Sequence, residues 1–302
     1  MNIEQLEDFL ELARELNFSR AAARRNVTQP AFSRRIAALE VSMQAQLITR
    51  TTRNVALTPA GLVLRNRAET LVGLMAQTRQ EVLEAAGREQ RSLNLAATHA
   101  LSYTFVPRWL MQVAGPSEIG TLNMVSDTMR QCLNLIRAGE VSFFICHAGA
   151  MPPEELPERQ FLGRQIGSDS LVPLCAPDDS GAPLWRLHGP ETVPLIAYAE
   201  ASGLREILER YWRKNGRPNT SAVMSSVLAS TNLEMAKAGQ GVAYLPRSLA
   251  DSDIGNGTLV RAGKQSDEVP VRVMIFRPRA RLSQHCEAFW EQVETHSTID
   301  AT

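Results

Sequence analysis

Arginine is concentrated in one stretch of this chain, residues 18–58. This stretch contains a single acidic residue, Glu40, although the whole chain balances 32 basic residues against 32 acidic ones. Its seven arginines are Arg20, Arg24, Arg25, Arg34, Arg35, Arg50 and Arg53. A solvated helical face usually mixes charges of both signs. A locally positive segment in a neutral protein therefore predicts a binding site for a polyanion.

Catalytic and metal-binding signatures are missing from the sequence. It contains no GxSxG, P-loop, HExxH or GxGxxG motif, and residues 168–170 are interpreted as a polar turn. Cys146 and His147 could suggest a thiolate–imidazole pair, but neighbouring residues of a strand point to opposite faces. Cys132, Cys146, Cys175 and Cys286 show no paired spacing. The sequence therefore predicts no enzyme, no metal site, no disulfide framework and no cofactor.

Three short helices are expected to position the arginines. Apolar residues recur every three or four positions over residues 3–16, which indicates one face of a first helix. Ser19 is placed to cap a second helix over residues 20–25. Thr28 can cap a third helix, and its hydroxyl is then expected to accept a hydrogen bond from the amide of Ala31. The tight turn between the second and third helices is typical of a helix-turn-helix.

The third helix separates its side chains into two faces when residues are placed about 100° apart. The apolar residues on the side expected to pack on the first helix are Phe32, Ile36, Leu39 and Met43. Arg34 points away from them, beside Pro30, with Gln29 and Ser33 on one flank and Arg35 on the other. A long forked donor among small residues suits entry into the major groove of DNA. The alternative is that Arg34 and Arg35 are ordinary surface residues. We favour DNA binding, because the helix cap, the turn and the apolar face of the third helix each agree with a helix-turn-helix independently.

Residues 3–65 resemble the N-terminal domain of LysR-type transcriptional regulators. The resemblance is carried by Leu6-Glu7-Asp8-Phe9, Phe18-Ser19-Arg20-Ala21-Ala22, Thr28-Gln29-Pro30-Ala31-Phe32-Ser33, Ile36-Ala37-Ala38-Leu39-Glu40 and Leu57-Thr58-Pro59-Ala60-Gly61. It implies that Gln29, Pro30, Ser33 and Arg34 contact bases. Arg35 is added to the predicted DNA-binding residues because it lies on the other flank of the third helix. The resemblance also implies that Arg50 and Arg53 belong to a wing reaching the backbone and minor groove.

Two positions depart from the family pattern. Gln44 stands where the family usually has glycine, so the third helix is expected to lack a left-handed cap. Ile48 stands where phenylalanine is usual, so the hydrophobic anchor of the wing should be smaller. Residues 1–58 are accordingly predicted to form a winged helix-turn-helix domain.

A long linker helix is expected over residues 59–90. Its heptad-spaced residues are Leu64, Ala68, Leu71, Met75, Thr78, Val82 and Ala85. This stripe is expected to meet a second copy of the chain, because helix-turn-helix proteins commonly bind paired half-sites. The alternative is that the helix lies along its own C-terminal domain.

Residues 91–302 alternate short apolar strands with helices, which predicts an α/β domain of parallel sheets covered by helices. Strands are expected at 93–97, 142–146, 171–175, 194–198, 222–225 and 271–276. Helices are expected at 104–113, 128–138, 203–214 and 228–238. Residues 239–246 resemble a glycine-to-proline signature of the LysR-type effector domain. The resemblance implies two subdomains like those of a periplasmic binding protein, 91–162 with 268–302, and 163–267.

An effector site is expected in the cleft between these subdomains, at the ends of strands. Residues 98–102 follow the first strand and open a helix, so free amides and hydroxyls should converge there. Simple capping by Thr98 or Ser102 is the alternative. The candidate effector-binding residues are Thr98, His99, Ser102, Thr128, His147, Ser202 and Ser226.

The predicted function is that of a sequence-specific transcriptional regulator controlled by a small molecule. It is expected to bind a pseudo-palindromic promoter site in double-stranded DNA as a homodimer or homotetramer, with RNA polymerase as a further partner. The N-terminus is acidic where a signal peptide would be basic, and the longest nearly apolar run, residues 143–151, is too short to span a bilayer. A cytoplasmic protein without membrane contact is therefore expected.

Oxidant sensing is the alternative function. Residues 25–36 and 97–102 resemble the hypochlorite-responsive branch of the LysR-type regulators, which implies switching by methionine or cysteine oxidation. The methionines in predicted apolar elements are Met111, Met124, Met224, Met235 and Met274. Methionine in such elements more often fills a core than senses an oxidant.

Overall fold

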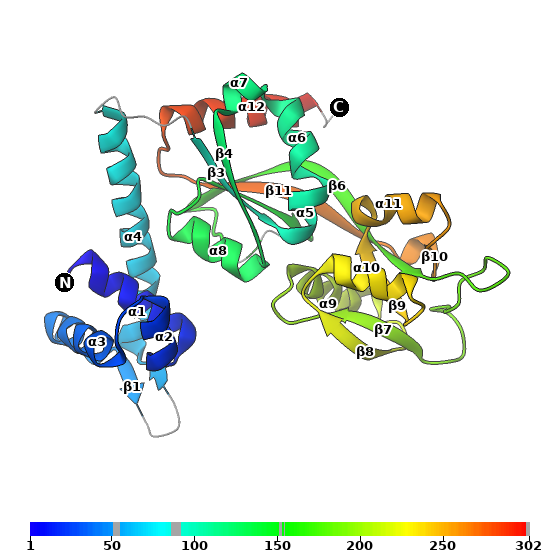
Figure 1. Ribbon diagram of the computed structural model, residues 1–302, viewed down its shortest axis with the longest axis horizontal. Coiled ribbons are helices and arrows are strands. Elements are labelled where there is room, and N and C mark those ends of the chain that lie inside the picture. The colour runs from blue at the N-terminus through cyan, green and yellow to red at the C-terminus, as the bar shows by residue number, and fades with distance from the viewer. Residues whose placement is uncertain (51–54, 86–91, 151–152, 154, 300–302) are drawn as a thin grey trace. The chain divides into compact units, whose positions relative to one another are not determined.

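The computed structural model describes residues 1–50, 55–85, 92–150, 153 and 155–299 (Figure 1). The chain forms two compact units, Met1–Glu89 with Arg137–Glu140, and Gln90–Ile136 with Val141–Thr302. The wing residue Arg53, residues 86–90 of the predicted linker and residue 91 lie outside the described residues. None of the described helices is both long and apolar enough to cross a membrane.

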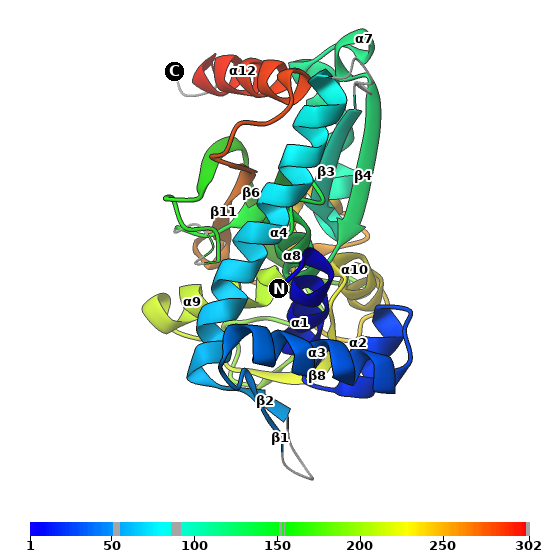
Figure 2. The ribbon, with the colours of Figure 1, turned by 90° about the vertical axis from the view of Figure 1, so that its left-hand side faces the viewer.

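The first unit is a helical cluster with a small hairpin (Figure 2). Its elements are α1 (Ile3–Glu15), α2 (Phe18–Arg24), α3 (Gln29–Met43), β1 (Ile48–Arg50), β2 (Val55–Leu57) and α4 (Pro59–Ala85). Strands β1 and β2 pair antiparallel. Phe9, Phe32 and Leu39 are completely buried in the core of the cluster. Ile48 is also buried there, so the smaller residue still anchors the base of the wing.

Three predictions about helix ends are wrong. Helix α2 starts before Ser19, because Asn17 accepts the capping hydrogen bond from the amide of Arg20 at 3.0 Å. Thr28 precedes α3 but makes no side-chain capping bond; it is exposed, so water can satisfy the amides at this helix end. Gln44 adopts the left-handed conformation (φ 51°, ψ 31°) that was expected to be missing without glycine.

Helix α4 contributes to the first unit and also exposes an apolar stripe. Leu64 and Ala68, the first residues of the predicted heptad seam, are buried against the helical cluster. Leu71, Met75 and Val82 are 40%, 55% and 62% exposed. The seam is therefore not available along its whole length, because its beginning is used in the core of its own domain.

The second unit is built on one sheet of nine strands within the described chain. Its strands are β3 (Ser92–Thr98), β4 (Thr121–Asp127), β5 (Phe143–Ala148), β6 (Phe161–Cys175), β7 (Val193–Tyr198), β8 (Thr220–Ser226), β9 (Val242–Pro246), β10 (Val260–Arg261) and β11 (Val269–Pro278). The order is β4-β3-β5-β11-β6-β9-β7-β8, with β10 paired to β6.

The sheet is mixed, so the prediction of parallel sheets is only partly right. Strand β3 is parallel to β4 and β5, and β7 is parallel to β8 and β9. The long strands β6 and β11 pair antiparallel with each other and with their outer neighbours. They connect a first lobe, containing β3–β5, to a second lobe, containing β7–β10. Strand β6 contains residue 163, where the chain is predicted to cross from the first subdomain to the second. Strand β11 begins next to residue 268, where the chain is predicted to return.

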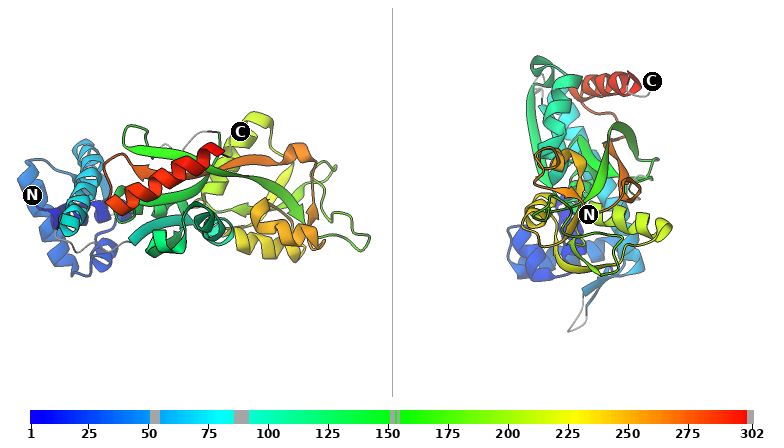
Figure 3. Two further views of the ribbon diagram at one scale, coloured as in Figure 1. Left: turned by 90° about the horizontal axis from the view of Figure 1, so that it is seen from above. Right: turned by 90° about the vertical axis from the view of Figure 1, so that its right-hand side faces the viewer.

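Helices cover both faces of each lobe. The helices of the second unit are α5 (His99–Thr104), α6 (Val106–Val113), α7 (Pro116–Ile119), α8 (Met129–Arg137), α9 (Gly203–Asn215), α10 (Ala229–Lys237), α11 (Arg247–Gly255) and α12 (Gln284–Ile299), with a 3₁₀ turn, η1 (Gln265–Asp267). In the first lobe α6 and α12 pack on one face and α8 on the other; α12 lies across the sheet in Figure 3. In the second lobe α9 packs on one face, and α10 and α11 on the other. The helix predicted at 104–113 is broken at Phe105 into α5 and α6.

Candidate recognition helix and effector pocket

Helix α3 has the two faces that its sequence predicts. Phe32, Ile36 and Leu39 have no exposed surface, whereas Arg34 is exposed. Arg34 makes no ion pair or hydrogen bond with the described residues. Of the other residues predicted to contact bases, Gln29 and Pro30 are exposed like Arg34, and Ser33 is half-buried. Met43, expected on the packed face, is 37% exposed at the end of the helix.

Arg35 differs from Arg34 because it has partners within the protein. Its Nη1 lies 2.6 Å from Oε1 of Glu4 and 3.3 Å from Oδ2 of Asp8. Asp8 is completely buried, and its Oδ1 also accepts a hydrogen bond from Nε of Arg25 at 2.8 Å. Arg25 further pairs with Glu7 at 2.7 Å. The guanidinium of Arg35 is thus directed towards helix α1.

Acidic residues of α1 also neutralise part of the arginine cluster. Arg20 and Arg24 pair with Glu15 at 3.0 Å and 2.8 Å. Together with Arg25 and Arg35, four of the seven clustered arginines have carboxylate partners, which the composition of residues 18–58 alone did not reveal. Among the described residues, the arginines of this stretch without a carboxylate partner are Arg34 and Arg50, so the unpaired positive charge is confined to fewer residues than predicted.

The wing is fastened to the helical cluster through Arg50 and Glu40. The Arg50 guanidinium lies 3.9 Å from the centre of the Phe18 ring, a cation–π contact. The Glu40 carboxylate accepts hydrogen bonds from the amides of Leu47 and Ile48 at 2.8 Å and 3.1 Å. The only acidic residue of the basic stretch thus connects α3 to β1.

A pocket in the second unit lies where the two lobes meet. It has a volume of about 430 Å³, including the part open to solvent. The first lobe contributes residues at the ends of β3, β4 and β5 and the starts of α5 and α8, and the second lobe contributes the starts of α9 and α10. Five of the seven predicted effector residues line it, namely Thr98, His99, Thr128, His147 and Ser202.

The other two predicted effector residues, Ser102 and Ser226, are not among the residues that line the pocket, and their hydroxyls form hydrogen bonds with neighbouring residues. The Ser226 hydroxyl accepts a hydrogen bond from the amide of Leu228 at 3.1 Å. The Ser102 hydroxyl donates to the carbonyl oxygen of His99 at 2.8 Å and lies 2.8 Å from Oγ of Ser126. Ser126 in turn lies 3.0 Å from Nδ1 of His99. Sequence analysis missed Ser126, because β4 was not predicted as a strand.

Comparison with known families identifies both units. Residues 3–62 match the bacterial regulatory helix-turn-helix proteins of the lysR family, and residues 86–298 match the LysR substrate binding domain. The chain belongs to the LysR family. It is a DNA-binding transcriptional regulator with an effector domain, as its sequence predicts. Members of the family are transcriptional regulators rather than enzymes.

Several similar proteins match almost the whole chain. The HTH-type transcriptional regulator YjiE of Escherichia coli K12 is 28% identical over 295 residues, which is 97% of this chain and 94% of YjiE. Full-length HypT of Salmonella typhimurium, described as a hypochlorite-specific LysR-type regulator, is 27% identical and covers 99% of both chains with a TM-score of 0.60. DarR of Vibrio fischeri, solved in complex with DNA, is 26% identical, covers 97% of this chain and 98% of DarR, and has a TM-score of 0.56.

One acidic residue of this LysR-type effector domain was misinterpreted from the sequence. Asp169, assigned to a polar turn at residues 168–170, belongs to β6. Its Oδ2 lies 3.4 Å from Nε2 of His147 and accepts a hydrogen bond from the Ser248 hydroxyl at 2.6 Å. Burial alone would raise the pKa of Asp169, but His147, Ser248 and the amide of Ser170 outweigh it and lower the pKa. Asp169 therefore holds together β5, β6 and the start of α11.

The thiols of the LysR-type domain are poorly suited to chemistry. All four cysteines are buried and unpaired. Burial raises the pKa of Cys132 to about 12 and also raises the pKa values of Cys146 and Cys175. A thiol that stays protonated is a weak nucleophile and a weak metal ligand. Among the described residues, no group of three or more His, Cys, Asp and Glu side chains could hold a metal ion.

Proposed function

We propose that this LysR-family protein is a ligand-responsive transcription factor that reads promoter DNA through α3. Its activity follows the occupation of the pocket between the lobes by a small molecule. The observation that carries this proposal is the pocket itself, because both lobes contribute polar residues to it. A ligand held there makes different contacts when the lobes move, and only such a differential interaction can shift a conformational equilibrium.

Arg34 is the proposed base reader, together with Gln29, Pro30 and Ser33. Support comes from its exposure opposite the buried face of α3 and from its lack of a partner among the described residues. A bidentate arginine–guanine pair contributes about 1–3 kcal/mol of discrimination against a wrong base. Arg50, on the wing, is proposed to contact the DNA backbone, and Arg53 is assigned there by family resemblance alone.

The test of this assignment compares Arg34→Ala with Arg50→Ala in gel-shift titrations on the cognate site and on random DNA. Arg34→Ala should weaken cognate binding by about 1–3 kcal/mol and random binding much less. Arg50→Ala should weaken both by similar factors and flatten the salt dependence. Equal losses on both DNAs for Arg34→Ala would show that Arg34 does not read bases.

The protein is further proposed to bind two half-sites of a pseudo-palindromic promoter as a homodimer or as a homotetramer. The exposed stripe of α4, formed by Leu71, Leu74, Met75 and Val82, supports this proposal. A contiguous apolar stripe on a long helix is the pattern of a helix-to-helix interface. The bacterial DNA that it binds lies in the cytoplasm, where we place its action.

The test of effector control uses Ser202, which lines the pocket and is buried. Ser102 is unsuitable because it does not line the pocket. Ser202→Trp should fill the pocket, abolish any response to effector and leave basal DNA binding intact. Native mass spectra of wild type and Ser202→Trp purified from the same cells should show a retained small molecule in the wild type alone. Retention by both would place the ligand elsewhere.

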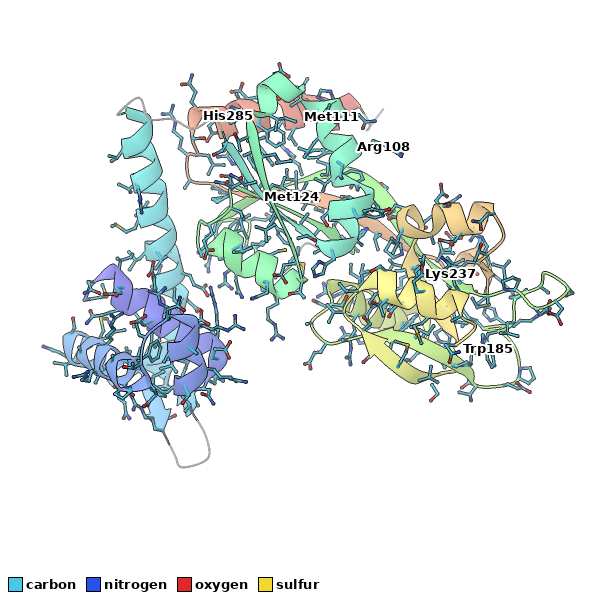
Figure 4. The ribbon with its side chains drawn as sticks, in the orientation of Figure 1. Arg108, Met111, Met124, Trp185, Lys237 and His285 are labelled. Carbon is cyan, nitrogen blue, oxygen red and sulfur yellow. The ribbon has the colours of Figure 1, made fainter. Side chains whose placement is uncertain are left out.

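A second candidate function is oxidant sensing, which the exposed methionines favour over the cysteines. Met111 on α6 and Met124 on β4 are labelled in Figure 4. They are 58% and 39% exposed, whereas the cysteines are buried. Similarity to HypT, described as hypochlorite-specific, supports the same candidate. Intact mass and DNA affinity before and after hypochlorite would test it. Methionine oxidation without any change in DNA binding would exclude this switch.

A further inference from the structure

Glu40 stands among the arginines of residues 18–58 as their only acidic residue. It belongs to α3 and falls on the same flank of that helix as Gln29 and Ser33, when residues are placed about 100° apart. A negative charge beside a DNA-binding face repels the phosphates of DNA. On electrostatic grounds alone, Glu40 should therefore weaken the binding of DNA.

The Glu40 side chain holds the start of the wing. One carboxylate oxygen, Oε1, accepts hydrogen bonds from the amides of both Leu47 and Ile48, at 2.8 Å and 3.1 Å. The main-chain carbonyl of Glu40 accepts a third hydrogen bond from the amide of Ala45 at 3.2 Å. Leu47 and Ile48 are each 1% exposed, so water has little access to replace the carboxylate. Glu40 thus fixes the segment that connects α3 to β1.

The same segment is held from its other side by the start of α4. The Thr58 amide donates a hydrogen bond to the carbonyl oxygen of Leu47 at 3.0 Å, and the Thr58 hydroxyl donates to the carbonyl oxygen of Gln46 at 2.7 Å. A side chain at Gly61 would collide with the carbonyl oxygen of Leu47. These contacts fix β1 to α4 only. The position of β1 relative to α3 therefore depends on the carboxylate of Glu40.

Arg50 lies two residues beyond Ile48, about 7 Å along β1. The hairpin of β1 and β2 projects from the helical cluster in Figure 2. The Arg50 guanidinium lies 3.9 Å from the centre of the Phe18 ring, and Phe18 packs edge-to-face on Phe32 of α3. A shift of Ile48 would move the guanidinium away from this ring. The anchor at Glu40 and the place of the Arg50 charge are thus linked through one short strand.

We propose that Glu40 is a positioning residue for DNA binding, which acts through the wing by holding Arg50 where it meets the DNA backbone. This inference rests on the proposed function, in which Arg50 contacts that backbone. The two amides that Glu40 holds then strengthen DNA binding more than its negative charge weakens it. Removing the only acidic residue of the basic stretch should therefore weaken DNA binding, against the electrostatic expectation.

The sizes of the two opposing effects favour the wing. One phosphate contact adds about 0.9 to the slope of log affinity against log salt concentration, which is roughly eightfold in affinity at about 0.1 M salt. A single charge about 10 Å from a phosphate is screened by one Debye length at this salt concentration, so its removal changes affinity by about twofold. Loss of the wing contact therefore outweighs loss of the negative charge.

Three substitutions separate the charge of Glu40 from its reach. Glu40→Gln keeps an Oε1 acceptor for both amides and removes only the charge. Glu40→Asp keeps the charge but withdraws the carboxylate from the amides by one methylene group. Glu40→Ala removes both. If Glu40 acts through the wing, Glu40→Asp and Glu40→Ala should behave alike, and Glu40→Gln should behave like the wild type.

The experiment measures the affinity of the full-length protein for a random-sequence duplex by fluorescence anisotropy over a range of salt concentrations. Glu40→Ala and Glu40→Asp should bind roughly eightfold more weakly at about 0.1 M salt, with a salt slope lower by about 1. Glu40→Gln should bind as tightly as wild type or up to about twofold more tightly. Glu11→Ala removes an acidic residue of α1 that has no contact with the wing, and should not weaken binding.

A double-mutant cycle with Arg50→Ala tests whether Glu40 acts through Arg50. In the Arg50→Ala background, Glu40→Ala should cause no further loss of affinity, because the contact that it positions is already gone. Discrimination between the cognate site and random DNA should be retained in Glu40→Ala, since Arg34 still reads bases. General damage to the domain would instead remove this discrimination.

The outcomes separate this inference from the proposed function. Glu40→Asp and Glu40→Ala binding as tightly as wild type, or losses that add to that of Arg50→Ala, would overturn the inference and leave the backbone contact of Arg50 in place. A Glu40→Gln variant as weak as Glu40→Ala, or a loss of discrimination in Glu40→Ala, would also overturn it. If Arg50→Ala itself leaves DNA binding unchanged, the proposed backbone contact fails and the inference fails with it.

Discussion

Arg35 and Asp8 form an ion pair that connects the recognition helix to the first helix, with Nη1 of Arg35 3.3 Å from Oδ2 of Asp8. Asp8 is completely buried and also pairs with Arg25 at 2.8 Å. One carboxylate thus holds α1, the end of α2 and α3 in a fixed arrangement. We infer that this arrangement keeps Arg35 turned inwards while its neighbour Arg34 faces outwards.

Replacing Asp8 by alanine should destabilise the first unit by about 1–3 kcal/mol. A fully buried pair that loses one partner costs about 3–5 kcal/mol, but here both guanidinium groups remain roughly a third exposed. Urea unfolding would measure the loss. Glu11→Ala removes only the longer pairs with the more exposed Arg14 and Arg24, at 3.5 Å and 3.7 Å, and should cost less than about 1 kcal/mol. Equal losses in the two variants would contradict a special role for Asp8.

The same pair bears on the assignment of Arg35 as a DNA contact. If Arg35 is held by Asp8 in the complex, Arg35→Met should leave the salt dependence of DNA binding unchanged. A phosphate contact would instead reduce the slope of log affinity against log salt concentration by about 1. Measuring that slope for wild type and Arg35→Met on random DNA therefore decides between a positioning residue and a direct contact.

The buried and exposed faces of α3 could be predicted, because helical periodicity alone separates Phe32 and Ile36 from Arg34. The arginine partners could not be predicted. Asp8 and Glu15 lie outside the basic stretch, and only the packing of α1 brings them to it. Helix ends were also missed, since Asn17 and Ser19 are both good capping residues and local sequence does not choose between them.

Some residues of the pocket could likewise be predicted from the sequence, and others could not. His99 and Ser202 were predicted from their places after strands and before helices. Ser126 and Asp127 were missed because β4 is an edge strand with seven exposed or half-exposed residues and no clear alternation. Asp169 was missed because a polar triplet in sequence indicates a turn, whereas pairing with β11 holds it in a strand. Long-range strand pairing decided both cases.

Gln44 provides a test of backbone strain at the end of α3. Its φ of 51° lies in the left-handed region, which costs a non-glycine residue about 1 kcal/mol or more. Gln44→Gly should therefore stabilise the protein by about 0.5–1 kcal/mol, less whatever entropy glycine adds to the unfolded chain. Thermal unfolding of Gln44→Gly and Gln44→Ala would measure the difference. If alanine stabilised as much as glycine, the gain could not come from φ.

Leu71 tests the proposed interface on α4. Leu71→Glu places a charge in the exposed apolar stripe, where a partner helix would desolvate it without an offsetting group. Sedimentation should show smaller species, and affinity for a two-half-site operator should fall much more than affinity for a single half-site. Thr70→Glu, at the neighbouring exposed position, should leave assembly unchanged. An unaltered oligomer in Leu71→Glu would mean that other surfaces hold the assembly.

Asp169 makes the stability of the effector domain depend on pH in a defined direction. Its folded-state pKa is lowered, so the folded state binds the proton less readily than the unfolded state does. The stability that its charge contributes is therefore fully present above the ordinary aspartate pKa of about 4, and it is lost as pH falls through the lowered folded-state value.

Asp169→Asn should cost about 1–3 kcal/mol near neutral pH, where the hydrogen bonds from Ser248 to a charged acceptor are lost. The difference in free energy of unfolding between wild type and Asp169→Asn should then shrink below about pH 4. Urea titrations at a series of pH values would measure it, with Asp179→Asn at an exposed turn as a control expected within about 0.5 kcal/mol of wild type. A difference that grew as pH fell would mean that Asp169 is protonated in the folded protein, and that His147 and Ser248 do not outweigh its burial.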